Sequence, residues 1–95
     1  MTIEASLILP NGEVDSVSLL EVDEARLRQL QELVGGCIEV VSLPGERCIV
    51  INENGKDGPH IINQTATAIA HEAEAIMASD YIAGVAVILP AEVLQ

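Results

Sequence analysis

Apolar and polar residues alternate along the first part of the chain, a pattern typical of β-strands. Two such segments, residues 3–10 and 13–19, flank an Asn11-Gly12 pair, which supplies the positive φ angles of a tight hairpin turn. The second segment is rich in Asp and Ser, so we expect it at an edge of the sheet.

Apolar positions with helical spacing follow this hairpin and predict a helix over residues 24–34. Asp23 is the expected N-cap, and Gly35 is the expected left-handed residue at the C-terminal end. Arg26 is expected to point away from the core. The predicted buried stripe consists of Leu27, Leu30, Leu33 and Val34.

A second hairpin is predicted by two apolar segments, residues 37–43 and 47–52, on either side of Pro44-Gly45, which suits a type II-like turn. With Leu43 opposite Glu46, both faces of this hairpin are largely apolar, so a helix or a second subunit should cover them. The second of these alternatives predicts a homodimer.

The rest of the chain predicts a second helix and a last strand. The helix should begin near Asn63 or Thr65. Its apolar stripe consists of Ala66, Ile69, Ala70, Ala73, Ile76 and Met77. Residues 81–89 are almost continuously apolar, so this strand should lie at the centre of the sheet with both faces buried.

The resulting element order is β-β-α-β-β-α-β. It predicts a single α+β domain over residues 1–95, with a mainly antiparallel sheet and two helices packed on one face. No linker rich in Pro, Gly or Ser divides the chain, so a second domain is not expected.

Charge narrows the range of partners. The chain has 15 acidic and 4 basic residues, a formal net charge of −11. Direct binding to nucleic acid or to an anionic membrane is not expected, because both require clustered Lys and Arg. No apolar run reaches the roughly 20 residues of a membrane span. Two isolated cysteines and the lack of a signal-peptide pattern predict a cytoplasmic protein.

Few residues are able to carry chemistry. Cys37 and Cys48 fall in predicted strands, where a thiol packs as a small hydrophobe, and the expected register places Cys48 opposite Val41 instead of Cys37. His71 and Glu74 share a helical turn, but no second His completes the usual metal-binding pair. The sequence therefore predicts no catalytic residue, metal or cofactor. It leaves enzymatic activity open and favours a binding role.

Two polar regions are candidate binding sites, since loops on rigid scaffolds often carry function. The first lies between the second hairpin and the second helix and contains Asn52, Glu53, Asn54, Lys56, His60, Asn63 and Thr65. The second is Asp80-Tyr81, because a lone aromatic side chain is able to anchor an interface.

Four segments resemble, in the same order, a family of short proteins from phages, plasmids and bacterial genomes that is catalogued as a domain of unknown function. They are LVGGCIEVV (residues 33–41), IVINENGK (49–56), NQTATAIA (63–70) and SDYIAGVAVIL (79–89). The resemblance begins at Leu33 and covers about two-thirds of the chain. It implies a mobile-element accessory protein, of the kind that blocks or diverts a host defence or regulatory system, and it implies no established activity.

We therefore expect a non-catalytic acidic accessory protein that binds a host or phage protein. Two alternatives stay open. A nucleic-acid mimic would occupy a basic protein surface and would gather its acids in one stripe or face. A small-ligand protein would bind a nucleotide-like molecule at a subunit boundary near Asn54, His60 and Asn63.

Overall fold

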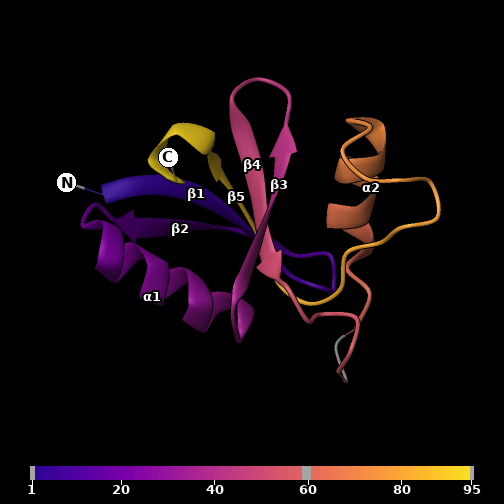
Figure 1. The fold of residues 1–95 in the computed structure, drawn as a ribbon, viewed down its shortest axis with the longest axis horizontal. Helices are drawn as coiled ribbons and strands as arrows, with labels where there is room; N and C mark the ends of the chain where they lie inside the picture. Colours follow the sequence, from indigo (N-terminus) through magenta and orange to yellow (C-terminus); the bar gives the residue numbers. More distant parts are fainter. Residues whose placement is uncertain (1, 59–60, 95) are drawn as a thin grey trace.

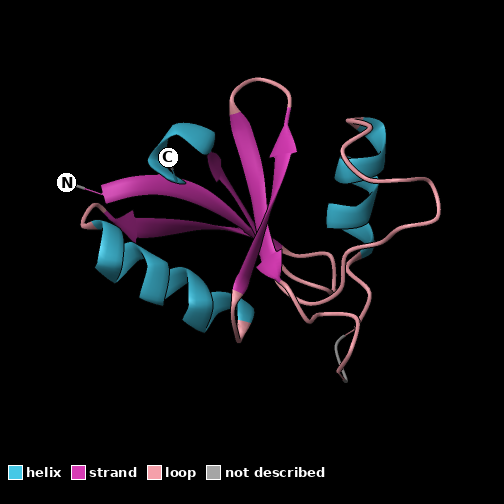
Figure 2. Ribbon diagram, viewed as in Figure 1, coloured by secondary structure: helices cyan, strands magenta, loops and turns pink. Residues whose placement is uncertain are grey.

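A computed structural model describes residues 2–58 and 61–94, in which a five-stranded antiparallel sheet carries two α-helices (Figure 1). The elements are β1 (Thr2–Ile8), β2 (Val14–Leu20), α1 (Asp23–Val34), β3 (Ile38–Leu43), β4 (Arg47–Asn52), α2 (Gln64–Glu72), β5 (Ala86–Pro90) and a short 3-10 helix η1 (Ala91–Leu94). The α+β class and the predicted order of strands and helices are confirmed (Figure 2).

The strands lie in the order β2-β1-β5-β4-β3. The last strand of the chain is therefore the central one, as its continuous apolar run predicted, and β2 lies at an edge as expected. Two sequence-local hairpins, β1-β2 and β3-β4, are joined only through β5, which pairs antiparallel with β1 on one side and with β4 on the other.

The strand β5 is shorter than the predicted segment 81–89. Gly84 has a φ of +83°, a left-handed backbone conformation that interrupts the extended chain. Before it, Ala83 makes only an isolated antiparallel bridge with Ile62. The residues from Tyr81 to Val85 therefore cross from α2 to the sheet as an irregular segment.

The predicted register of the β3-β4 hairpin is wrong by one residue. Leu43 pairs with Arg47, not with Glu46. The connection has three residues, and two of them, Gly45 and Glu46, have φ values of +77° and +59°. A three-residue loop with left-handed positions needs one residue more than the two-residue turn that Pro44-Gly45 suggested.

Because of this shift, every side chain of β3 lies on the face opposite to its expected position relative to β4. Val40 now pairs with Val50, and Ser42 pairs with Cys48. Cys37 is exposed, Cys48 is buried, and both thiols are free, so the expected lack of a disulfide between them holds.

The two helices pack on opposite faces of the sheet, which corrects the expectation that both lie on one face. On β4, Cys48 and Val50 belong to the core cluster under α1, whereas Ile49 and Ile51 belong to the cluster under α2. Side chains alternate along a strand, so a strand that is apolar at every position needs cover on both sides. The chain itself supplies that cover for both faces of the β3-β4 hairpin.

Helix α1 uses a different buried stripe from the predicted one. It begins after Val22, not Asp23, and it ends as expected at Gly35, whose φ is +82°. Leu30 and Val34 are buried as predicted, but Leu27 is 43% exposed. The third buried position is Arg26, which was expected to face solvent.

Arg26 is buried because the end of β2 and the η1 helix surround its guanidinium group with acceptors. Nη1 donates to the carbonyl oxygens of Leu20 and Glu21, at 3.1 and 2.8 Å, and Nη2 donates to the Val93 carbonyl and to the Asp23 carboxylate, at 2.5 and 2.6 Å. A buried guanidinium is tolerated only when its donors are satisfied in this way. The side chain thus ties α1, β2 and η1 together.

Helix α2 begins at the predicted cap, Asn63, but ends at Glu72, well before Met77. Its buried residues are Ala66 and Ala70, whose small side chains contribute to the cluster on this face of the sheet. No helix in residues 2–58 and 61–94 is long and apolar enough to cross a bilayer.

Candidate functional site

Two of the candidate binding residues are structural. Asn52 is buried at the end of β4, where its Nδ2 donates to the Val34 carbonyl oxygen at 3.1 Å and its Oδ1 accepts the Asn54 N–H at 2.8 Å. The amide thereby joins the C-terminal end of α1 to the turn after β4. Gly36 permits this contact, because a Cβ atom there would lie 2.9 Å from Asn52 Nδ2.

Asn63 is fully buried and has the same kind of role. Its Oδ1 accepts the Ala66 N–H at 3.0 Å as an N-cap, and its Nδ2 donates to the carbonyl oxygens of Ile8 and Gly84, at 3.0 and 2.9 Å. Both the amide nitrogen and the amide oxygen of this buried side chain are hydrogen-bonded to the backbone. It is therefore not available to a ligand.

Of the remaining candidates in the first region, some line a cavity and others do not. Asn54 is exposed in the turn after β4, and Thr65 is partly buried in the first turn of α2; neither lines a cavity with the others. His60 lies outside the described residues. Glu53 and Lys56 do lie at a cavity, and so do both residues of the second region, Asp80 and Tyr81.

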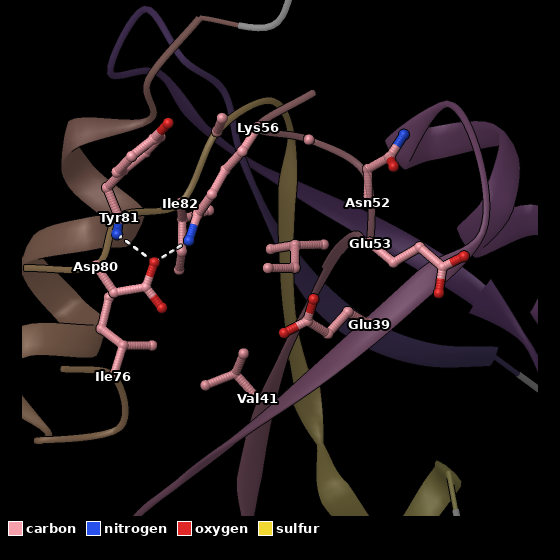
Figure 3. A pocket seen from close by; sticks show the side chains of 12 residues that line it. Glu39, Val41, Asn52, Glu53, Lys56, Ile76, Asp80, Tyr81 and Ile82 are labelled. Carbon is pink, nitrogen blue, oxygen red and sulfur yellow. Dashed lines mark hydrogen bonds and ion pairs between the residues drawn. The ribbon is translucent and has the colours of Figure 1, made fainter. Parts of the chain in front are cut away.

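That cavity lies between β3, the end of β4 and the segment that leads into β5, and it encloses about 100 Å³ (Figure 3). Asp80, Tyr81 and Lys56 lie on one side of it, and Glu39 and Glu53 lie on the other. Glu39, Val41 and Ile76 were not among the sequence candidates. They reach the site only because the fold brings β3 beside residues 76–83.

Lys56, Asp80 and Tyr81 form one interacting group. The Lys56 ammonium donates to Asp80 Oδ1 in an ion pair and lies 4.9 Å from the centroid of the Tyr81 ring. The Tyr81 N–H donates to the same carboxylate oxygen at 2.8 Å. The two predicted regions therefore meet in a single site.

These contacts shift the pKa values of Asp80 and Lys56 in the directions that favour the charged forms of both side chains. The hydrogen bond from Lys56, and then that from the Tyr81 backbone, lower the pKa of Asp80 below its usual value. The hydrogen bond to Asp80 raises the pKa of Lys56. His71 adds a further contact, because its Nε2 lies 2.8 Å from the Asp80 carbonyl oxygen; a carbonyl only accepts, so this nitrogen carries the proton.

Glu39 and Glu53 leave negative charge at the cavity. Glu39 pairs with Ile51 in the sheet, so alternation puts its carboxylate on the α2 side, and Figure 3 shows it directed toward the cavity. Glu53 follows the last residue of β4 and lines the rim, where its carboxylate extends away from Glu39 (Figure 3). Neither carboxylate has an ion-pair partner in the described part of the chain. Lys56 is paired with Asp80 and also interacts electrostatically with Glu39, but one ammonium group does not compensate all of these carboxylates, so the cavity keeps a net negative charge.

A second, open hollow of about 530 Å³ continues from the cavity along the outer edge of β3. The two share Glu39, Val41, Ile76 and Asp80, so they form one continuous depression, the β3 groove. It is lined by Glu39, Val40, Val41, Ser42, Ile51, Asn52, Glu53, Gly55, Lys56, Glu74, Ala75, Ile76, Met77, Asp80, Tyr81, Ile82 and Ala83. Among the described residues, no three His, Cys, Asp or Glu side chains are placed to hold a metal ion.

Comparison with known proteins shows that a family model covers most of the chain. Residues 3–92 match a family model described as a domain of unknown function (DUF3846). The match extends over the first thirty residues, which the four resembling segments left out. No curated protein and no solved structure matches the chain.

Proposed function

We propose that this chain, which belongs to the family described as a domain of unknown function (DUF3846), is an accessory protein that binds a protein partner through the β3 groove. The observation that carries the proposal is the negative charge of Glu39 and Glu53, which have no ion-pair partner among the described residues, at a groove that exposed apolar residues also line. Met77 is 76% exposed, and Val40, at the edge of β3, is 47% exposed. Apolar contact area with a polar rim is the composition of protein interfaces.

The partner belongs, in this proposal, to the host cell or to a phage, and the chain inhibits or regulates a defence or regulatory system. The resemblance to short phage and plasmid proteins supports this setting. The free thiols of Cys37 and Cys48 support a reducing compartment, the cytoplasm.

Two observations favour a protein partner over the alternatives. Exposed acids occur on β1, β2, α1, β3 and α2, on both sides of the sheet, whereas a nucleic-acid mimic needs them in one stripe. The enclosed cavity of about 100 Å³ is below the roughly 300–1,000 Å³ of small-molecule sites, the adjoining hollow of about 530 Å³ is open to solvent, and the acidic side chains that line both repel phosphate.

The test is capture of partners from host lysate by the tagged chain at low salt, with two charge-reversal variants. The groove variant carries Glu39→Lys and Glu53→Lys. The control carries Glu13→Lys and Glu32→Lys, which make the same change of charge at exposed positions away from the groove. We expect the wild type and the control to retain the same partner and the groove variant to lose it. Equal retention by all three would contradict the proposal, as would a lack of any partner above background.

The homodimer expected from the apolar hairpin remains a prediction. Light scattering of the purified chain over a range of concentrations tests it directly, since a dimer doubles the measured mass.

A further inference from the structure

The outer edge of β3 presents backbone groups that have no backbone partner among residues 2–58 and 61–94. The strand ends the sheet, so only one of its two sides is paired. The Glu53 N–H donates to the Cys37 carbonyl oxygen at 2.9 Å, so the carbonyl of Cys37 points toward β4. Backbone direction alternates along an antiparallel strand, so the N–H and C=O groups of Ile38, Val40 and Ser42 point outward.

This edge has few of the features that usually prevent pairing with another chain. Edge strands are commonly protected by Lys, Pro, a β-bulge or a charge that points inward over the edge. The β3 strand contains no Lys or Pro, and its pairing with β4 runs through six consecutive residue pairs without a bulge. Its one charged residue, Glu39, points toward the cavity.

The side chains beside the edge select what pairs with it. On the α2 side, an added strand would lie next to Glu39 and Val41. On the α1 side, it would lie next to Val40, which is half-exposed. A matching segment therefore alternates basic and apolar side chains, because opposite charges and apolar pairs stabilise neighbouring strands.

Charge decides between a second copy and a different chain. Glu39, Glu53 and Glu74 have no ion-pair partner among the described residues, and the basic side chain in the groove, Lys56, is already paired. A second copy would bring the same unpaired acids and a net charge of −11 to the edge. A Lys- or Arg-containing segment instead compensates the charge that is present.

We propose that an extended basic segment of the partner protein adds to β3 as a sixth strand, with a Lys or Arg side chain entering the cavity beside Glu39. This inference rests on the proposed function and specifies the chemistry of the partner. The cavity of about 100 Å³ holds the volume of about three water molecules, which suits the end of one side chain. Addition of a strand to a free sheet edge is a recurrent mode of peptide recognition.

The probe is a fluorescent peptide that alternates Lys and Val over seven residues, and binding is followed by anisotropy at about physiological ionic strength. Two further versions of the peptide are methylated on the backbone. The first carries an N-methyl group on the amide of every Val, and the second carries one on the amide of every Lys. In an added strand only one of these sets of amides points at β3. We expect one version to bind about tenfold more weakly, or worse, and the other to bind like the parent peptide. Equal affinities for all three peptides, or an equal loss for both methylated ones, would overturn the proposal.

Variants of the chain give an independent readout. Val40→Pro removes an outward N–H without removing a bond to β4, so the fold should survive while peptide affinity falls about tenfold. Glu39→Gln should weaken binding of the Lys-containing peptide and should not weaken that of a peptide with Gln at the Lys positions. Unchanged affinity in Val40→Pro, with the native circular dichroism spectrum retained, would rule out strand addition.

The failure of this inference is distinguishable from failure of the proposed function. Loss of the lysate partner in the Glu39→Lys, Glu53→Lys variant, together with its retention by Val40→Pro, would leave a protein-binding groove that does not use strand addition. A wild-type dimer that Val40→Pro converts to a monomer would show that a second copy occupies the edge, and the basic-segment proposal would be wrong.

Discussion

The Asn63 side-chain amide donates a hydrogen bond to the Ile8 carbonyl oxygen at 3.0 Å, and so fastens the start of α2 to the end of β1, fifty-five residues earlier in the chain. The same side chain caps α2 and holds the Gly84 carbonyl. One buried amide thus fixes where the helix, the first hairpin and the entry to β5 meet.

Replacing this amide tests the arrangement. In Asn63→Asp the carboxylate still accepts the Ala66 N–H but cannot donate to the carbonyls of Ile8 and Gly84. We expect the free energy of unfolding at pH 7 to fall by about 2–4 kcal/mol, because two buried acceptors lose their donor beside a buried charge. Urea denaturation measures the change. Acidic pH should restore part of it, since the neutral carboxyl group regains one donor.

The matched control is Gln64→Glu, which makes the same amide-to-carboxylate change at the adjacent exposed position. It should alter the free energy of unfolding by no more than about 0.5 kcal/mol. Similar losses in the two variants would contradict the role given to Asn63.

Arg26 and Arg28 offer a second matched pair. Arg26→Met removes the guanidinium group that donates to the carbonyls of Leu20, Glu21 and Val93, and we expect the free energy of unfolding to fall by about 2–4 kcal/mol. Arg28→Met removes the same charge from an exposed position and should cost no more than about 0.5 kcal/mol. Thermal melts of both variants make the comparison. Hydrogen exchange should also speed up in η1 in the first variant alone.

The ion pair between Lys56 and Asp80 predicts how the stability of the protein changes with pH. Its hydrogen bonds hold the folded-state pKa of Asp80 below the usual value of about 3.9, so its contribution to stability is present above that pH and is lost as the pH falls through the folded value. In Lys56→Met, an NMR titration should show the pKa of Asp80 rising toward its usual value. The stability difference between this variant and the wild type should shrink in strong acid, where the contact of Lys56 with the Tyr81 ring remains but the ion pair does not.

Lys56→Arg retains the charge and is the control for this titration, so it should keep most of the shift. The Lys56 pKa is itself raised, so at the alkaline end its contribution is lost only as the pH rises through a folded value above about 10.4. An unchanged pKa of Asp80 in Lys56→Met would show that the pair does not form in solution.

The two cysteines should differ sharply in reactivity. Cys37 is exposed, whereas Cys48 is buried, and burial raises the pKa of its thiol. Since the thiolate is the reactive form, a thiol reagent should titrate one cysteine in the native protein and two in urea. Cys37→Ser should abolish the native reaction. Fast reaction of Cys48 in that variant would indicate that the sheet opens at β4.

Much of the fold was predictable because its signals are local. Continuous apolar residues placed β5 at the centre, Asp and Ser placed β2 at an edge, and Gly35 and Asn63 marked helix ends through their own backbone and side-chain chemistry. The β3-β4 register was not predictable in this way. Both faces of the β3-β4 hairpin are largely apolar, so its pattern tolerates a one-residue shift, and the three-residue loop depends on the left-handed conformation of Glu46.

The site shows the same division. Lys56, Asp80 and Tyr81 were chosen separately and prove to be one interacting group, whereas Asn52 and Asn63 were chosen as polar loop residues and prove to be buried supports of the backbone. Glu39 was missed because only the pairing of β3 with β4 brings it to the cavity. Arg26 was missed because its acceptors come from β2 and η1, which the helical pattern does not reveal.

The central place of β5 has a consequence for synthesis on the ribosome. The β1-β2 and β3-β4 hairpins emerge first, and the inner edges of β1 and β4 stay unpaired until residues 86–90 follow. At about 5–20 residues per second, the delay between Asn52 and Pro90 lasts about 2–8 s. Unfinished chains on neighbouring ribosomes then expose matching strand edges to one another. We expect mutual repulsion between the acidic nascent chains to oppose this pairing during the interval.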